Sequence, residues 1–169
     1  MPLRKGFTAL LALGFLISGC TIEPRTDRGS TQTQDQERNR RQVIQPDGVA
    51  SLPIFSLAIR SGDLIFLSGQ LGAVPGESPP RVVEGGIEAE TRQTIENISA
   101  VLDAAGATLQ DLLKCTVFLA DIEDYEAMNA VYAEYFTSDP PARAALAGSG
   151  LALGALVELD CIAVAPSSG

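Results

Sequence analysis

The feature that most limits the fold of this chain is a change in composition near residue 53. The preceding stretch, Thr21–Leu52, is rich in Gln, Thr, Arg and Asp and contains no aromatic residue. Such a segment cannot bury enough apolar surface to offset the entropy lost on ordering it. We therefore expect residues 20–52 to form a flexible polar tether, and residues 53–169 to form one folded domain.

The N-terminus has the pattern of a targeting segment. Arg4 and Lys5 precede an apolar run that ends at Gly19, which is too short to span a bilayer but suits a signal peptide over residues 1–19. The run ends in "ISGC", which resembles the bacterial lipobox and predicts that Cys20 is acylated. The protein would then be exported and lipid-anchored to a bacterial envelope membrane. An ordinary secretory signal with an incidental cysteine is the alternative.

The rest of the sequence alternates strand-like and helix-like segments. Residues 55–72 read as two short strands around the turn "RSGD", and residues 112–120 read as a third strand. Residues 87–107 and 125–136 have the apolar spacing of amphipathic helices. Two more strands follow, separated by the glycines of "GSGLALG", which we interpret as a loop. This order predicts an α+β fold, a mixed β-sheet with two helices packed on one face.

Several side chains can be assigned to these elements. Gly106 is the expected C-terminal cap of the first helix, and Asp121 or Asp124 is the expected N-terminal cap of the second. We expect the second helix to bury a stripe of Tyr125, Met128, Val131, Tyr132 and Tyr135. The charged residues Glu90, Glu96 and Asp103 should form a solvated face of the first helix. Cys115 and Cys161 lie in apolar strands and are expected to be core residues with free thiols.

Composition excludes several kinds of chemistry. The chain contains no histidine, so it cannot use an imidazole base, a Ser-His-Asp triad or His-ligated zinc. The three cysteines do not have metal-ligand spacing, and we expect neither a metal nor a cofactor. The formal net charge is -9, which repels phosphate backbones and argues against nucleic acid as a partner.

Three charged side chains stand out in the apolar segment from Pro140 to Ala165. Arg143 follows a proline pair, and Glu158 and Asp160 lie in the last apolar run. A buried charge is costly unless it is paired or used. The alternation of a strand places Glu158 and Asp160 on one face. An internal ion pair between Arg143 and Glu158 is one explanation, and a ligand site is the other.

The sequence of the folded part resembles the RidA family, also called YjgF, of enamine/imine deaminases. The resemblance rests on "GDLIFLSGQLG", "TRQTIENISAVLDAAGA", "TVFLAD", "MNAVY", "PPARAALA" and "GALVELDCIAVA", and it covers about residues 53 to 165. It implies a chorismate-mutase-like fold. It also implies a homotrimer whose ligand clefts lie between subunits.

The resemblance also assigns site residues. The arginine of "PAR", here Arg143, would bind the carboxylate of a 2-imino acid through two parallel hydrogen bonds. Glu158 would be the catalytic base that activates water. Ser68 and Gly69 of "LSGQ" match a strand end that contacts the ligand, and Asn129 of "AMNAVY" matches a polar residue that lines the cleft.

This chain departs from the family pattern at three positions. Phe55 stands where active members commonly have the tyrosine of "PYSQA", so the ring is kept and the hydroxyl is lost. Leu57 replaces the glutamine of that motif, and Ala145 stands where some members have cysteine. A lost hydroxyl removes one orienting hydrogen bond, worth roughly 1 kcal/mol.

Three functions are compatible with these residues. The first is a RidA-like deaminase that hydrolyses 2-imino or enamine acids to 2-oxo acids and ammonia. The second is a non-catalytic trimeric lipoprotein that binds small carboxylates in its inter-subunit clefts. The third is a structural envelope protein with vestigial clefts. Arg143 and Glu158 favour catalysis, whereas Phe55 and the export signal favour binding.

Overall fold

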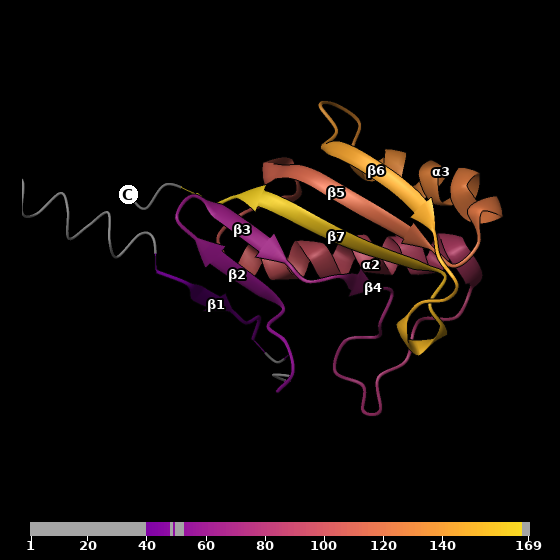
Figure 1. Cartoon of the computed structure of the whole chain (residues 1–169), viewed down its shortest axis with the longest axis horizontal. Helices are drawn as coiled ribbons and strands as arrows, with labels where there is room; N and C mark the ends of the chain where they lie inside the picture. Colours follow the sequence, from indigo (N-terminus) through magenta and orange to yellow (C-terminus); the bar gives the residue numbers. More distant parts are fainter. Residues whose placement is uncertain (1–39, 48, 50–52, 167–169) are drawn as a thin grey trace, which may run out of the picture.

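The computed structural model describes residues 40–47, 49 and 53–166, which form one mixed sheet covered by two helices (Figure 1). The described strands join in the order β1-β2-β3-β7-β5-β6, and β4 pairs with β7. Only β5 and β6 run parallel. The strands are β1 (Gln42–Ile44), β2 (Ala58–Ser61), β3 (Leu64–Leu67), β4 (Gln70–Leu71), β5 (Leu112–Leu119), β6 (Ala142–Ala147) and β7 (Val157–Val164).

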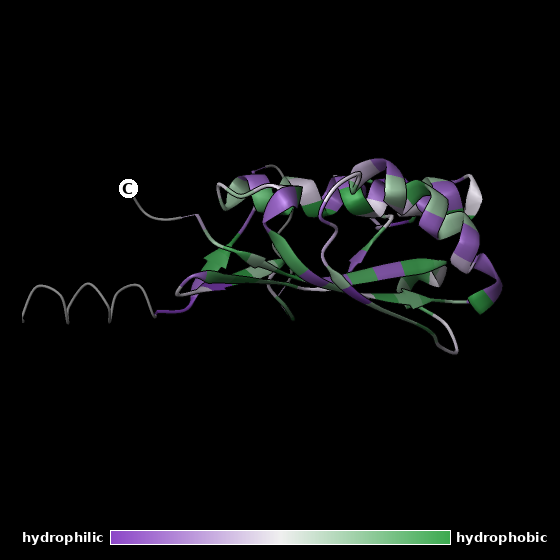
Figure 2. Cartoon of the chain, turned by 90° about the horizontal axis from the view of Figure 1, so that it is seen from above, coloured by the Kyte–Doolittle hydropathy of each residue, from purple (hydrophilic) through white to green (hydrophobic). Residues whose placement is uncertain are grey.

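Both long helices lie on the same side of the sheet, as Figure 2 shows from above. Helix α2 (Gly86–Ala104) links β4 to β5, and α3 (Tyr125–Tyr135) links the parallel strands β5 and β6. The predicted α+β architecture is confirmed. Gly106 follows α2 with a left-handed φ of 73°, which is the conformation that favours glycine after a helix. Asp121 caps the short turn before α3, since its carboxylate accepts a hydrogen bond from the Glu123 N–H at 3.0 Å.

The folded part begins earlier than the composition predicts. Strand β1 lies inside the segment that we expected to be tether, and it pairs antiparallel with β2. Of its three residues only Ile44 is buried in the core, with 8% of its surface exposed. Backbone pairing to β2 therefore orders a segment whose side chains contribute little apolar surface.

The core lies between the helices and one face of the sheet. Ile95, Ile98 and Leu102 project from α2 onto this face and are fully buried. Strand β7 alternates buried and more exposed residues along its whole length. Its residues 157, 159, 161 and 163 therefore point to the helices, while residues 158, 160, 162 and 164 point to the other side, called the open face below.

The expectation of free thiols at Cys115 and Cys161 is wrong. These residues lie directly opposite one another on β5 and β7, with their Cα atoms 4.1 Å apart, and they form a disulfide. Both are fully buried, as predicted. The sequence pattern of each strand indicates burial, but only the register between the two strands brings the sulfurs together.

Glu90 also departs from its prediction, because it is a buried residue and not part of a solvated helix face. Only 4% of its surface is exposed, and its Oε2 atom accepts a hydrogen bond of 2.7 Å from the Leu156 N–H. This bond fixes the chain to α2 immediately before β7 begins. A Cβ atom at Gly72 would lie 2.8 Å from the Glu90 backbone, so this close approach also requires a glycine.

Candidate functional site

Glu158 projects from the open face of β7 and is half-buried. Burial raises the pKa of its carboxyl group, and the neighbouring charge of Asp160 raises it further. Asp160 is exposed and lies on the same face, as strand alternation predicts. A carboxylate with a raised pKa is a better proton acceptor, which is the property that a general base requires.

Gly69 lies directly against the Glu158 carboxylate. A Cβ atom built on Gly69 would overlap Oε1 of Glu158 and lie 2.8 Å from its Cδ atom. Any side chain at position 69 would therefore displace the carboxylate. Gly69 lies between β3 and β4, and β4 pairs with β7 through Leu71 and Glu158. The structure thus brings together Glu158 and Gly69, two of the residues that the resemblance assigned to one site.

Ser68 connects this site to the chain segment that carries Phe55. Its backbone N–H donates to the Leu57 carbonyl at 2.9 Å, and its hydroxyl donates to the Ser56 carbonyl at 2.7 Å. These bonds hold residues 56–57 against the end of β3. Phe55 precedes that segment and is 44% exposed. An apolar ring therefore reaches the surface near the strand end where Glu158 lies.

Arg143 lies elsewhere, on the edge strand β6. It pairs in register with Cys115 of β5, whose side chain faces the helices. The Arg143 Cζ atom lies 4.8 Å from the ring centroid of Tyr132 and 5.8 Å from that of Tyr125, both on α3. Its Nη2 atom donates a hydrogen bond of 3.3 Å to the Tyr125 hydroxyl. The guanidinium is thus held by aromatic rings, which leave its other N–H groups available to an anion.

Polar atoms of α3 complete the surroundings of Arg143. Within the described residues, Oδ1 of Asn129 and the hydroxyl of Tyr132 are buried and have no hydrogen-bond partner. The Asn129 side chain lowers the pKa of Tyr125, and the positive charge of Arg143 lowers it further. Burial raises the pKa of Tyr132, and Arg143 opposes this effect. Unpaired buried polar atoms beside a guanidinium are the expected features of a binding site for a small anion.

The prediction of a buried tyrosine stripe is only partly correct. Tyr132 is 5% exposed and belongs to the core, but Tyr125 is 37% exposed and its hydroxyl contacts Arg143. Sequence reasoning missed this role because helical spacing places Tyr125 on the apolar face. The signal that could have found it is the position of Tyr125 at the first turn of α3, where a side chain can reach past the end of the core.

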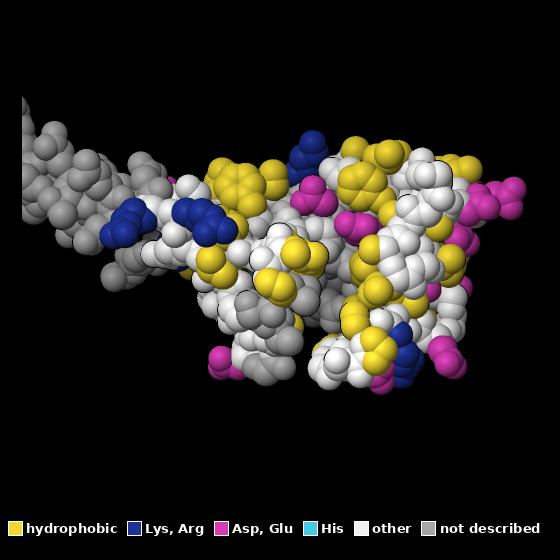
Figure 3. All heavy atoms as spheres, turned by 60° about the horizontal axis from the view of Figure 1, so that its bottom comes forward, with side chains coloured by type: hydrophobic (Ala, Val, Ile, Leu, Met, Phe, Trp, Pro, Cys, Tyr) yellow, Lys and Arg dark blue, Asp and Glu magenta, His cyan; other side chains and the backbone are white. Residues whose placement is uncertain are grey.

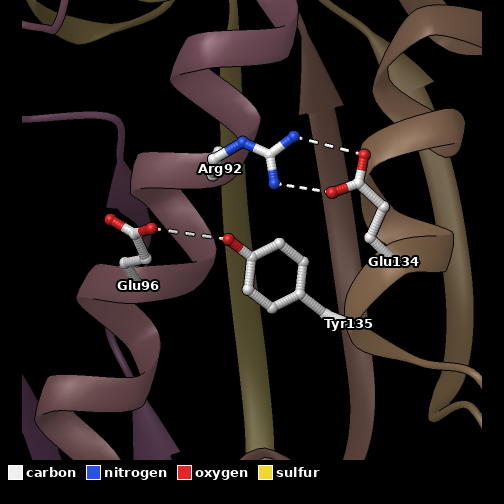
Figure 4. Close-up of polar contacts among 4 residues, drawn as sticks. All are labelled: Arg92, Glu96, Glu134 and Tyr135. Atoms are coloured by element: carbon white, nitrogen blue, oxygen red, sulfur yellow. Dashed lines mark hydrogen bonds and ion pairs between the residues drawn. The ribbon is translucent and has the colours of Figure 1, made fainter.

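Polar contacts join α2 to α3, as Figure 4 shows. Arg92 of α2 forms a bidentate ion pair with Glu134 of α3, with N–O distances of 2.6 and 3.2 Å. The hydrogen bonds from Arg92, and to a lesser degree its charge, lower the pKa of Glu134. The Tyr135 hydroxyl donates to Glu96 at 3.5 Å. These groups are exposed or half-buried, so each contributes little stability, but together they set the helix register.

The two parts of the predicted site lie on opposite faces of the sheet. Cys161 and Cys115 face the helices, and Arg143 shares that face through its register with Cys115. Glu158 is three residues from Cys161 on the same strand and therefore faces the other way. An internal ion pair between Arg143 and Glu158 is thus ruled out within one chain.

Two features are absent from the part of the chain that the structure describes: a cluster of metal ligands and a helix that could cross a membrane. Within residues 40–47, 49 and 53–166, no group of three or more Cys, Asp or Glu side chains could hold a metal ion. None of the helices in this part of the chain is long and apolar enough to cross a membrane. Cys20 and the signal peptide lie outside the described residues.

Comparison with known proteins identifies the family and the fold. The sequence profile of the family described as Endoribonuclease L-PSP matches residues 47–165. A 2-iminobutanoate/2-iminopropanoate deaminase of Capra hircus is 40% identical over 125 residues, which are 74% of this chain and 90% of that protein. The chain belongs to the RidA/YjgF family.

Other members of the RidA/YjgF family support the same conclusion. A RutC family protein of Pyrococcus horikoshii is 44% identical over 109 residues, which are 64% of this chain and 85% of that protein. The crystal structure of RidA from an Antarctic Psychrobacter bacterium has a TM-score of 0.67 at 35% identity, and the match covers 73% of this chain and 98% of that chain. The family match over residues 47–165 includes β2 to β7 and both long helices, whereas β1 precedes it.

Proposed function

We propose that this protein is a deaminase that hydrolyses 2-imino acids, and the enamines in equilibrium with them, to 2-oxo acids and ammonia. The observation that carries the proposal is the half-buried Glu158 carboxylate, whose pKa is raised and which lies directly against Gly69. Relatives of this chain are named as deaminases of 2-iminobutanoate and 2-iminopropanoate. The proposed substrate class is therefore small 2-imino acids.

The proposed reaction requires one base and one carboxylate-binding group. Arg143 binds the substrate carboxylate through its free N–H groups and thereby fixes the position of C2. Glu158 takes a proton from water as the water oxygen bonds to C2 and the C=N π electron pair moves to nitrogen, and it then passes this proton to nitrogen. In the resulting tetrahedral adduct, Glu158 takes the proton of the new hydroxyl as the C2=O bond forms and the C2–N bond breaks. It gives this second proton to the departing nitrogen, so that ammonia and the 2-oxo acid are released and Glu158 is again ionised. No oxidant or reductant takes part.

We further propose that the active unit is a homotrimer with Arg143 of one protomer facing Glu158 of the next. Their positions on opposite faces of one sheet support this arrangement. The open face also carries exposed apolar side chains, among them Val43, Phe66 and Val164. Figure 3 shows such hydrophobic patches on the surface with acidic side chains between them. Light scattering on residues 40–169 should give three times the protomer mass, whereas a monomer that persists on concentration would contradict the proposal.

The second candidate is a non-catalytic protein that binds small carboxylates in the same clefts. The observation that favours it is Phe55, which is 44% exposed and has no hydroxyl to orient a substrate. The two candidates differ in their response to Glu158→Gln. In a deaminase this change should lower the rate by roughly 10²–10⁴-fold while pyruvate still binds. In a carboxylate-binding protein only the affinity for pyruvate should change.

The family description names a ribonuclease, but the charge of this chain opposes RNA as its substrate. The formal net charge is -9, and binding to a phosphate backbone depends on basic side chains that release its counterions. The chain also has no histidine to act as the general acid and base of RNA cleavage. A small anion held by a single arginine requires neither feature.

We propose that the protein is exported and held to a bacterial envelope membrane by acylated Cys20. The "ISGC" sequence supports the anchor, and the Cys115–Cys161 disulfide supports an oxidising compartment outside the cytoplasm. In cells that express the full chain, Cys20→Ser should move the protein from the membrane pellet to the soluble fraction or leave it uncleaved. A variant that is cleaved like the unmutated protein and still pellets with the membrane would contradict the lipid anchor.

The deaminase activity is tested with 2-iminopropanoate that is generated in the assay mixture. An amino-acid oxidase converts alanine to 2-iminopropanoate, and release of ammonia is followed with and without the purified domain. The proposal predicts that the domain accelerates release, and that Arg143→Ala reduces both turnover and pyruvate binding by about 30- to 150-fold, through loss of a charge-assisted pair. Ammonia release at the uncatalysed rate, together with tight pyruvate binding, would decide for the binding protein.

A further inference from the structure

The hydroxyl of Tyr125 occupies an unusual position among the aromatic side chains of α3. Tyr132 is buried in the core, and Tyr135 contacts Glu96 at the interface with α2. Tyr125 is instead 37% exposed, and its oxygen accepts a hydrogen bond from Nη2 of Arg143 at 3.3 Å. It is therefore the one phenol of α3 whose oxygen lies both at the surface and against the guanidinium.

The direction of this hydrogen bond leaves the phenol proton free. A guanidinium can only donate, so the Tyr125 oxygen acts as the acceptor and its own O–H must point away from Arg143. An anion bound to the remaining N–H groups of Arg143 lies beside this O–H. A carboxylate in that place can accept one hydrogen bond from the phenol in addition to those from the guanidinium.

The residue at position 55 explains why a further hydrogen-bond donor to the ligand is needed. The tyrosine that the family resemblance leads one to expect at position 55 is a phenylalanine here, so the N-terminal side of the site supplies a ring without a hydroxyl. Tyr132, which lies against Arg143, and Asn129, which lies against Tyr125, have a buried hydroxyl and a buried Oδ1. Tyr125 adds an exposed donor on the Arg143 side.

We propose that Tyr125 is a substrate-positioning residue: its oxygen orients the Arg143 guanidinium, and its O–H donates a hydrogen bond to the substrate carboxylate. This inference rests on the deaminase or carboxylate-binding function proposed above, because both place a carboxylate at Arg143. It assigns to Tyr125 the orienting role that a phenylalanine at position 55 cannot perform.

The electrostatics of the cluster agree with this role. The Asn129 side chain and the Arg143 charge lower the pKa of Tyr125. A more acidic phenol is a stronger hydrogen-bond donor to an anion. The cation–π contact with Tyr132, at 4.8 Å, also holds the guanidinium. Arg143 thus contacts two tyrosines, of which Tyr125 is exposed and Tyr132 is buried.

The test compares two variants that each remove one hydroxyl from the same helix. Tyr125→Phe keeps the ring beside Arg143, and Tyr135→Phe is the matched control, since its hydroxyl contacts Glu96 and not the site. We expect Tyr125→Phe to raise the Kd for pyruvate and the KM for 2-iminopropanoate by about tenfold, with kcat changed by less than about threefold. Tyr135→Phe should leave Kd and KM unchanged. Equal effects of the two variants, or no effect of Tyr125→Phe, would overturn the proposal.

A second measurement separates this inference from the proposed function. The chain has three tyrosines, so their ionisation can be followed by absorbance at 295 nm. The contact predicts that the earliest ionisation step belongs to Tyr125, disappears in Tyr125→Phe, and moves to higher pH in Arg143→Ala. If this pattern is found but the unmutated protein neither binds pyruvate nor releases ammonia, the contact is real and the proposed function fails. If pyruvate binds but the titration is the same in Arg143→Ala, the positioning role is excluded.

Discussion

Removal of the Cys115–Cys161 disulfide should lower the free energy of unfolding of this domain by several kcal/mol. The bond is fully buried and joins residues separated by 46 positions. Closing a loop of this size lowers the entropy of the unfolded chain, which is worth roughly 4 kcal/mol in the chain-entropy model. Domains are typically stable by only about 5–15 kcal/mol, so the disulfide supplies roughly a quarter to four-fifths of the folding free energy.

The perturbation can be made in two ways that leave the rest of the chain intact. The first is reduction of the unfolded protein followed by refolding in reductant, and the second is the double variant Cys115→Ala/Cys161→Ala. Urea unfolding at one fixed protomer concentration gives the free energy of unfolding for each form. We expect the reduced protein to be destabilised by about 3–4 kcal/mol, and the alanine variant by more, since it also loses buried sulfur contacts.

Two results would refute this reasoning. The first is a reduced protein within about 1 kcal/mol of the oxidised one, which would mean that the bond contributes little. The second is the detection of two reactive thiols per unfolded chain in protein taken from the cell envelope. That result would remove the disulfide and, with it, the support that the disulfide gives to export.

Two further predictions concern the Glu158 side of the site. Gly69→Ala should displace the Glu158 carboxylate and lower kcat by roughly 10²-fold, whereas Gly148→Ala, where a Cβ meets no atom within 4 Å, should leave kcat unchanged. Equal activity of the two variants would show that the carboxylate position is unimportant. Because the base must be unprotonated and the pKa of Glu158 is raised, activity should fall as pH is lowered through a value above the ordinary 4.3 or so. Asp160→Asn removes one cause of the raised pKa of Glu158, so activity should be lost at a lower pH in this variant. If the pH at which activity is lost does not change, Asp160 is excluded as a cause of the raised pKa.

Much of the fold could be predicted because the elements follow local patterns. Helix α2 is predictable from its apolar spacing and from Gly106, which ends it. The hairpin of β2 and β3 is predictable from the turn at Gly62 and Asp63. Strand β1 is not, because its pairing uses backbone groups and buries only Ile44, so composition assigns it to the tether.

The site could be predicted only in part. The residue types at positions 143 and 158 stand out as charges in apolar strands, and the resemblance gives each a role. Their placement on opposite faces depends on the parallel pairing of β5 with β6 and on the register of β5 with β7. The disulfide depends on the same register. Neither is encoded in the pattern of a single strand, and the contact of Tyr125 with Arg143 requires the position of α3 as well.

The central claim is that one substrate is held by Arg143 of one chain and attacked through Glu158 of another, and complementation between inactive variants tests it most directly. Arg143→Ala and Glu158→Gln are each expected to be inactive alone. If differently tagged copies of the two are co-expressed in equal amounts and assemble at random, about a quarter of the clefts in a cyclic trimer receive both intact side chains. The account predicts that the mixed protein recovers about this fraction of the unmutated ammonia release. A mixed trimer that is as inactive as its parents would contradict it.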